Sequence, residues 1–312
     1  MKVLVTGGAG FIGSHIVEHF QNKAEICVLD NLSSGFQRNL NGLQCEFVPG
    51  SILDRSLVRQ VMQGVDFVFH LAAMVSVPES MRKPVECAET NTIGTLVVLE
   101  EAARAKVKKL VFSSSAAIYG DNPVVPKQET MPPEPKSPYA MSKLDGEFYC
   151  RLFMDEGWLQ TVSLRYFNVF GPRQNSGGQY AAAVPIFIDR ALQNETITIF
   201  GDGEQTRDLV YVKSVVAANV FFAMQSTTGG VLNVASGQQV TIRELATKIR
   251  ELTGSHSEIT YAAERLGDVK HSLANIEKLR TTGFALTSDH KKELQATIEF
   301  SRRSSRPISR QG

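Results

Sequence analysis

Thr6-Gly7-Gly8-Ala9-Gly10-Phe11-Ile12-Gly13 lies close to the start of the chain and is its most informative segment. Its glycines have the spacing G-x-x-G-x-x-G. A short apolar run that reads as a strand (2–6) precedes them, and a helical pattern follows to about residue 20. Glycines at this spacing allow a tight turn and let the backbone approach a pyrophosphate at a helix N-terminus. The stretch therefore predicts a dinucleotide-binding loop of an α/β fold.

An acidic residue at the end of the next predicted strand (25–29) supports this interpretation. Asp30 lies about twenty residues beyond the glycines, where a carboxylate can accept hydrogen bonds from ribose hydroxyls. The same negative charge would repel a 2′-phosphate. The sequence therefore predicts NAD, rather than NADP, as the cofactor.

Strand and helix patterns alternate through the first 165 residues, which predicts a doubly wound parallel sheet. We expect residues 1–165 to form this NAD-binding domain, with parts of 209–236 returning to it. Residues 166–208 and 237–300 are less regular and are predicted to form a smaller α/β substrate-binding portion. The range 301–312 is rich in arginine and serine, and we expect it to be a disordered tail.

A second motif lies at residues 137–143, which read Ser-Pro-Tyr-Ala-Met-Ser-Lys. Pro138 suits the first turn of a helix because its missing N–H is not needed there. Tyr139 and Lys143 are then four residues apart on one helical face. An ammonium beside a phenol favours the phenolate, so we expect the pKa of Tyr139 to fall below its usual ~10. Such a tyrosine would be a general acid/base near neutral pH.

The composition excludes several classes of partner. The chain has 312 residues and a net charge of +1, which indicates neither nucleic acid nor an anionic membrane surface as a partner. No apolar run is long enough to span a bilayer, and the N-terminus does not read as a signal peptide. No His/Cys cluster has metal-ligand spacing, so no metal is expected. Scattered cysteines without a C-x-x-C pair suggest reduced thiols in a cytoplasmic protein.

Several further motifs occur in a fixed order along the chain. They are H-L-A-A (70–73), S-S-S (113–115), R-Y-F-N-x-F-G-P (165–172), T-R-D (206–208) and R-x-G-D (265–268). With the glycine loop and Tyr139-x-x-x-Lys143, they resemble the extended short-chain dehydrogenase/reductase family, in particular its UDP-galactose (UDP-glucose) 4-epimerase group. The resemblance covers residues 6 to about 279. It implies a Rossmann sheet and NAD-dependent 4-epimerisation of a UDP-hexose through a 4-keto intermediate.

The resemblance also implies roles for individual side chains. Tyr139 would take the proton from the sugar 4-hydroxyl, Lys143 would lower the Tyr139 pKa and hold the nicotinamide ribose, and Ser115 would relay the proton or orient the 4-oxygen. Arginine is the usual donor to phosphate oxygens, which agrees with a diphosphate-binding role for Arg207 and Arg265. The implied substrate-binding residues are Ser115, Tyr139, Asn168, Arg207, Arg265, Asp268 and Ser272.

The cofactor site is expected at the carboxyl ends of the parallel strands, where such sheets bind ligands. Asn91 is expected near the nicotinamide. One departure concerns the adenine, because Ser51 stands where the family often has aspartate in Gly-Asp-Ile. The implied cofactor-binding residues are Gly7, Gly10, Phe11, Ile12, Gly13, Asp30, Asn31, Ser51, Ile52, Leu71, Ala72, Ala73, Asn91, Ser113, Tyr139 and Lys143.

Other sugar-nucleotide enzymes share the first half-reaction and are alternatives. The dehydratases that resemble this chain carry an Asp-Glu pair just after the catalytic Ser/Thr, and the decarboxylases usually keep the glutamate. This chain has Ala116 and Ala117 at these positions, which disfavours both classes. A UDP-glucuronate 4-epimerase shares the Ser-Ser-Ser pattern and stays open. A protein that binds NAD or a sugar nucleotide without catalysis is a further alternative, although Ser115, Tyr139 and Lys143 argue against it.

Two further expectations follow from the resemblance. In 4-epimerases, a bulky residue after the R-x-G-D segment closes off the 2-substituent of the hexose. Counting onward from Arg265 places Ser272 there, so we expect UDP-N-acetylglucosamine to be accepted as well as UDP-glucose. A homodimer is expected through a four-helix bundle of the predicted helices 84–106 and 139–156. Its apolar faces could come from Leu96, Val97, Leu99, Leu144, Phe148 and Leu152. The same six residues could equally belong to the subunit core.

Overall fold

The computed structural model describes residues 1–177, 182–264 and 270–304. Its first half alternates strands and helices as predicted. The elements are β1 (Lys2–Thr6), α1 (Phe11–His19), β2 (Glu25–Asp30), η1 (Gln37–Leu40), β3 (Glu46–Pro49), α2 (Arg55–Val61), β4 (Phe67–His70), α3 (Val77–Arg82), α4 (Pro84–Ala88), η2 (Glu89–Ile93), α5 (Gly94–Arg104), β5 (Lys109–Ser115), η3 (Ala116–Tyr119), α6 (Pro138–Asp155) and β6 (Thr161–Tyr166).

The second half contributes shorter strands and five further helices among the described residues. They are β7 (Asn168–Phe170), α7 (Ala183–Leu192), β8 (Ile197–Phe200), β9 (Thr206–Tyr211), α8 (Val212–Met224), β10 (Gly230–Val234), β11 (Gln239–Thr241), α9 (Ile242–Thr253), β12 (Ile259–Ala262), α10 (Glu277–Thr281) and α11 (His290–Ser304). Shortly before α10, Ala274 forms an isolated β-bridge with Lys127.

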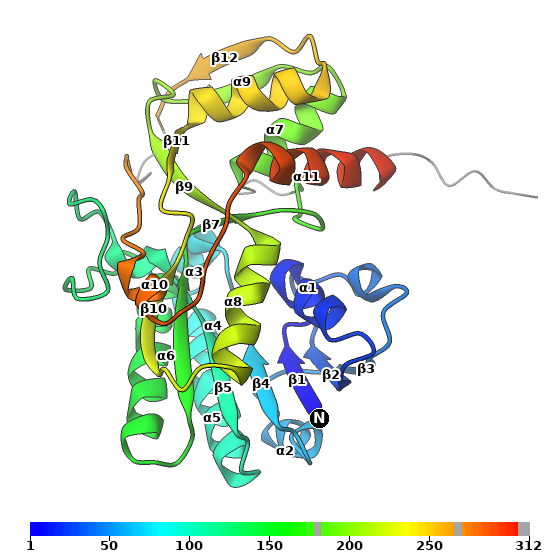
Figure 1. Cartoon of the computed structure of the whole chain (residues 1–312), viewed down its shortest axis with the longest axis vertical. Helices are drawn as coiled ribbons and strands as arrows, with labels where there is room; N and C mark the ends of the chain where they lie inside the picture. The colour runs from blue at the N-terminus through cyan, green and yellow to red at the C-terminus, as the bar shows by residue number, and fades with distance from the viewer. Residues whose placement is uncertain (178–181, 265–269, 305–312) are drawn as a thin grey trace, which may run out of the picture.

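A seven-stranded parallel sheet forms the centre of the larger part of the molecule (Figure 1). Its strand order is β10-β6-β5-β4-β1-β2-β3, and every neighbouring pair is parallel. The order 3-2-1-4-5-6 is that of a doubly wound dinucleotide-binding sheet, here extended by one strand at the β6 edge. The predicted α/β Rossmann fold is therefore confirmed.

Helices cover both faces of this sheet, because its strands are apolar on both sides. On one face, α1 and α8 pack on β1, β5 and β6, with Ile16 and Phe222 fully buried in the shared core. On the other face, α2, α5 and α6 pack on β1, β4 and β5 through a second core that includes Val58, Leu99 and Cys150. The sheet is thus held between two helical layers.

Two small sheets and three helices form the rest of the molecule, in the upper half of Figure 1. The sheets have the orders β11-β9-β7 and β12-β8. Helices α7, α9 and α11 pack with these strands around a third core that contains Phe187, Ile199 and Leu245. We propose that this part holds the substrate.

The structure corrects two predicted boundaries. Residues 237–300 do not all belong to the smaller part, because Ala274, Ile276 and Leu279 are buried in the core of the large sheet. The tail does not begin at residue 301, since α11 continues to Ser304. This helix is amphipathic: it buries Leu294 and Ile298 in the third core and keeps its basic residues outside. The rest of the predicted tail, 305–312, lies outside the described residues.

The predicted helix 84–106 is also more complex than expected. It consists of α4, a π-helical turn (η2) and α5, which follow one another without a break. Within the described residues, no helix is both long enough and apolar enough to span a membrane. The same residues contain no group of His, Cys, Asp or Glu side chains suited to hold a metal ion.

Candidate active site

A cleft of ≈ 840 Å³ opens at the carboxyl ends of the sheet strands, where α/β sheets of this kind bind ligands. The glycine loop, Asp30, Ser115, Tyr139 and Lys143 all line it. So does every other predicted cofactor-binding residue except Asn91. Residues up to 133 positions apart in the sequence are therefore brought together at one end of the sheet, from Gly10 in the loop to Ser51, Ala73 and Lys143.

The glycine loop is tightly packed against its neighbours. A Cβ added to Gly7 would lie 2.7 Å from the backbone nitrogen of Ala72, and one added to Gly13 would lie 2.3 Å from the carbonyl oxygen of Gly7. Neither position has room for a side chain. Gly7 also has a φ of +71°, which glycine adopts without strain. The loop can therefore approach a pyrophosphate with backbone alone, ahead of the N-terminus of α1.

Asp30 stands at the end of β2, facing the cleft. Its carboxylate accepts hydrogen bonds from the backbone N–H of Ala9 (3.0 Å) and of Leu32 (2.8 Å). Burial raises the pKa of Asp30, and these two donors work against that rise. The carboxylate is thus fixed beside the glycine loop, where it suits the ribose hydroxyls of a dinucleotide. Ser51 also lines the cleft, and its hydroxyl accepts from Leu53 N–H.

Tyr139 lies in the first turn of α6. The Ser137 hydroxyl caps this helix by accepting from Ala140 N–H, and Pro138 occupies the first turn as predicted. The expected lowering of the tyrosine pKa is wrong for this structure. Burial raises the pKa of Tyr139 above its ordinary value, and a hydrogen bond with Ser115 only partly opposes this rise.

The position of Lys143 explains that correction. Its ammonium donates to the carbonyl oxygen of Ser113 at 2.8 Å and lies 5.8 Å from the centre of the Tyr139 ring. The lysine is itself buried, and burial lowers its pKa to about 8. The ammonium is therefore directed at the end of β5 rather than at the phenol oxygen, so burial decides the tyrosine pKa.

Ser115 is the last residue of β5. Its hydroxyl accepts a hydrogen bond from Ala117 N–H at 3.1 Å, at the start of η3. This contact fixes the hydroxyl oxygen and leaves its proton to be donated toward Tyr139 or a ligand. Ser115, Tyr139 and Lys143 therefore form one cluster at the end of β5, as the sequence predicted.

Asn91 does not line the cleft. It is buried in η2, where its side-chain amide accepts from Met74 N–H (2.7 Å) and donates to Met74 O (3.0 Å) and Ser142 Oγ (2.9 Å). These bonds tie the segment after β4 to α6. Asn91 therefore supports the cleft wall from behind.

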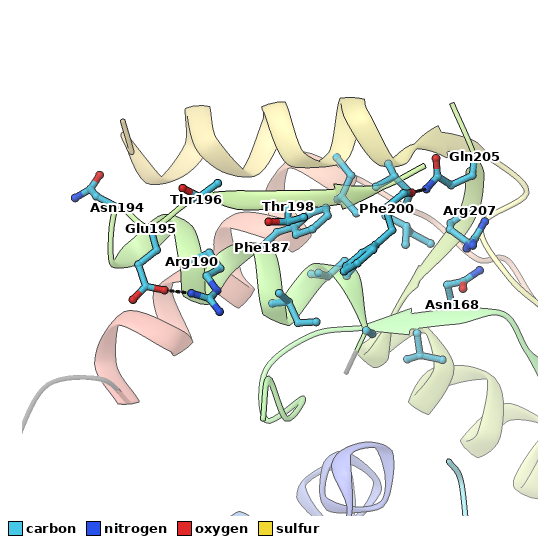
Figure 2. A pocket seen from close by; sticks show the side chains of 18 residues that line it. Asn168, Phe187, Arg190, Asn194, Glu195, Thr196, Thr198, Phe200, Gln205 and Arg207 are labelled. Atoms are coloured by element: carbon cyan, nitrogen blue, oxygen red, sulfur yellow. Dashed lines mark hydrogen bonds and ion pairs between the residues drawn. The ribbon is translucent and has the colours of Figure 1, made fainter. Parts of the chain in front are cut away.

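A second cavity of ≈ 1010 Å³ lies in the smaller part, between α7, β8, β9 and α9 (Figure 2). Asn168 and Arg207 line one end of it, as Figure 2 shows, with Phe200 between them and the far end. Val169 and Ala182 line both this cavity and the cofactor cleft. The two cavities therefore adjoin, and a ligand could occupy both.

Several side chains of the second cavity are not predicted by any sequence motif. Phe187 and Phe200 provide apolar rings, and Arg190 pairs with Glu195 at the far end. No motif marks Phe187 or Arg190, because both lie within an ordinary amphipathic helix. The Gly-Asp-Gly turn after Phe200 was the only local signal available.

Three predicted substrate-binding residues are not among the described residues that line either cavity. Two of them, Arg265 and Asp268, lie outside the described part of the chain. Ser272 is partly buried, and its N–H donates to the carbonyl oxygen of Thr206 at 3.2 Å, one residue before Arg207. It lies beside the second cavity without lining it. Its proposed role as a gate stays a prediction.

Comparison with known proteins agrees with this geometry. Residues 3–235 match the model of the NAD dependent epimerase/dehydratase family, and the chain belongs to that family. The glycine loop and Asp30 fit its cofactor, NAD, because they offer a backbone cradle for pyrophosphate and an acceptor for ribose.

Individual relatives match over nearly the whole chain. The UDP-glucose 4-epimerase of Mycolicibacterium smegmatis is 37% identical over 98% of this chain and 100% of its own length. The UDP-N-acetylglucosamine 4-epimerase of Methanobrevibacter ruminantium, solved with UDP-N-acetylmuramic acid, is 40% identical, with a TM-score of 0.94 over 97% of this chain and 98% of its own. The UDP-glucose 4-epimerase of Thermotoga maritima, solved with UDP-glucose, is 42% identical, with a TM-score of 0.93 over 97% and 99%.

The buried ammonium of Lys143 makes stability depend on pH. Because its folded pKa is lowered to about 8 from an ordinary 10.5, the unfolded chain binds more protons between these values. The free energy of unfolding due to this group therefore rises with pH across that window. A Lys143→Met variant lacks this titration. Urea denaturation should show the wild type gaining stability relative to Lys143→Met between about pH 7.5 and about pH 10.

Lys108→Met changes an exposed lysine and provides the control. Its stability difference from the wild type should vary much less over the same pH range. A difference between wild type and Lys143→Met that stays constant across that range would contradict the buried, weakly basic lysine.

Proposed function

We propose that this chain is a UDP-hexose 4-epimerase that interconverts UDP-glucose and UDP-galactose and also accepts their N-acetylated counterparts. The observation that carries the proposal is the junction of the two cavities. The cofactor cleft is lined by Tyr139, Lys143 and the glycine loop, and the second cavity is lined by Asn168 and Arg207. A sugar nucleotide seated across the junction would present its hexose to the tyrosine. The names of the relatives over the whole chain length support this reading.

The second cavity suits the nucleotide end of such a substrate. Phe187 and Phe200 give apolar surface against which a base can pack. Arg207 supplies a guanidinium near the junction, and Asn168 supplies an amide there. Guanidinium groups are strong donors to phosphate oxygens, so we assign Arg207 to the diphosphate. Arg265 is proposed to join Arg207 at the diphosphate, and Asp268 is proposed to contact another part of the substrate.

The chemistry at C4 needs a proton acceptor and a hydride acceptor. When bound, NAD supplies the hydride acceptor and a positively charged ring that favours the ionised phenol beside it. Tyr139 takes the proton of the sugar 4-hydroxyl as C4 loses hydride, which leaves a 4-keto sugar. After the keto sugar has turned over in the cavity, Tyr139 returns the proton to the 4-oxygen as hydride reaches the opposite face of C4. The reaction is redox-neutral overall.

The other residues of the cluster hold the reacting groups in place. Ser115, fixed by Ala117 N–H, donates to the 4-oxygen or to the phenol. Lys143 joins the first part of α6 to the Ser113 carbonyl and is proposed to bind the nicotinamide ribose. Proximity and orientation of this kind can supply much of a rate enhancement.

The chain lacks the groups that rival reactions need. Elimination of water requires an acid and a base next to the 4-keto sugar, and the positions after Ser115 are Ala116 and Ala117. Neither can transfer a proton. A dehydratase or a decarboxylase of the usual type is therefore disfavoured. A UDP-glucuronate 4-epimerase is the remaining alternative, and substrate turnover distinguishes it from a UDP-hexose 4-epimerase.

We also propose a cytoplasmic homodimer through α4, η2, α5 and α6. Ile93, Phe148 and Leu152 are exposed to 50%, 59% and 45%, although they are large and apolar, which suits a covered surface. Val97 and Leu99 are buried in the subunit core, which is the other position that the sequence leaves open for them. The four free cysteines fit a reducing compartment. Sedimentation at micromolar concentration should give the dimer mass, and a monomer would contradict this surface assignment.

The direct test is NMR of the purified protein with UDP-glucose or UDP-N-acetylglucosamine, with no cofactor added. We expect the galacto anomeric signals to appear from both, because NAD should stay bound between turnovers. Conversion of UDP-glucose alone would overturn the N-acetyl part of the proposal. Failure with both sugars, even with NAD supplied, would overturn the UDP-hexose assignment, and activity on UDP-glucuronate would then replace it.

Replacing Tyr139 tests the acid/base role. Tyr139→Phe keeps the ring and removes the hydroxyl, so NAD should still bind while turnover falls by about two to four orders of magnitude. The measurements are the NAD content of the purified variant and its epimerisation rate. A rate close to that of the wild type would exclude Tyr139 as the base.

Enlarging Ser272 tests the proposed gate. Ser272→Tyr should abolish turnover of the N-acetylated sugar and largely spare UDP-glucose, since one added side chain can exclude a larger substrate. Ser272→Ala is the matched control and should leave both activities close to those of the wild type. Equal loss of both substrates in the tyrosine variant, or loss of neither, would show that Ser272 is not the gate.

A further inference from the structure

A buried ion pair lies next to the catalytic cluster, and the proposed mechanism does not use it. Glu147 and Arg165 are 5% and 4% exposed. The Arg165 guanidinium donates from Nε to Glu147 Oε1 at 2.8 Å and from Nη2 to Oε2 at 2.7 Å. Ser114 Oγ donates to the same Oε1 at 2.5 Å. Glu147 thus joins helix α6 to both β5 and β6.

The pair shares its elements with the catalytic residues. Tyr139, Lys143 and Glu147 are spaced by four residues on α6 and therefore lie along one helical face. On β5, Ser113 accepts from Lys143, while Ser114 binds Glu147 and precedes Ser115. The register places Ser114 beside Arg165 on β6. Any shift of α6 relative to β5 would therefore disturb the ion pair and the catalytic contacts together.

A buried ion pair is a poor way to gain stability, because desolvation of two charges opposes their attraction. Apolar side chains could hold α6 on the sheet equally well. Fork-like Arg–carboxylate bonds, however, have a narrow geometry, and apolar contacts do not. The Arg165 guanidinium also stacks on Tyr119, 4.8 Å from the ring centre, and Tyr119 donates to Asn233 on β10 at 2.7 Å. The pair is thus held rigidly from both sides.

We infer that Glu147 and Arg165 are positioning residues that fix α6 against β5, so that Tyr139 and Lys143 meet Ser115 in reactive geometry. Neither side chain lines the cleft, so neither touches the ligand. The inference deepens the proposed function and rests on it for the reaction concerned. A displacement of about 1 Å at a reacting group can cost about 100-fold in rate, so a loss of this order is expected without the pair.

The test compares Glu147→Gln with Glu101→Gln. Glu101 is also buried and accepts two bonds from one arginine, Arg59 Nε at 3.0 Å and Nη2 at 3.1 Å, but it joins α2 to α5 away from the cleft. Both variants should lose stability. Only Glu147→Gln should lose turnover, by about 10- to 100-fold in kcat with KM changed little, measured on the NAD-loaded protein. A wild-type kcat in Glu147→Gln, or equal losses in both variants, would overturn the inference.

A double variant separates positioning from stability. Glu147→Leu with Arg165→Met removes both buried charges, so the free energy of unfolding should return to the wild-type value or above it. Turnover should stay low, because apolar contacts do not restore the narrow geometry. Recovery of turnover together with stability would show a purely structural role.

A spectroscopic readout does not depend on the substrate. The phenolate absorbance of Tyr139, obtained by subtracting the titration of a Tyr139→Phe partner, should titrate closer to the ordinary value in Glu147→Gln, because a loosened helix end admits water. Its titratable neighbours, Lys143 and Cys87, are the same in all variants. An unchanged titration would count against the inference even if no UDP-sugar were turned over. Failure of the wild type to turn over any UDP-sugar would instead contradict the proposed function, and the Tyr139 titration would still test the positioning role.

Discussion

The contact between helix α6 and the end of strand β5 is the constraint on which the site depends. Lys143 donates to the Ser113 carbonyl, and Glu147 binds Ser114 and Arg165 one turn further along. Both contacts are buried and directional, so α6 has one position along the strand. Because Tyr139 lies in the first turn of the helix and Ser115 ends the strand, that position also decides where the two hydroxyl groups lie in the cleft.

Two other features of the fold, the glycine loop and the second cavity, lie close to this contact. The glycine loop meets Ala72 so closely that no side chain fits between them, which lets a dinucleotide lie against the backbone beside Asp30. The smaller part brings a second cavity that shares Val169 and Ala182 with the cofactor cleft. The cofactor cleft, Tyr139 and the second cavity therefore lie next to one another.

Local motifs predicted much of this arrangement, because each depends on neighbouring residues and on general rules of parallel sheets. The glycine loop, Asp30 and the Tyr139–Lys143 pair all line the cleft. Properties set by distant packing were not predictable. Asn91 does not line the cleft, and its amide is bonded to Met74 and Ser142 instead. The pKa of Tyr139 is raised because burial outweighs any effect of Lys143. Val97 and Leu99 carry the same apolar pattern as an interface but belong to the core.

In the proposed reaction, Tyr139 exchanges only a proton while the hydrogen on C4 leaves and returns within one site. Turnover of UDP-glucose deuterated at C4 distinguishes this direct transfer from exchange with water. Mass spectrometry and NMR of the UDP-galactose formed in ordinary water should show the deuterium retained at C4. Product that has lost its deuterium to the solvent, or carries it at another carbon, would exclude the direct transfer.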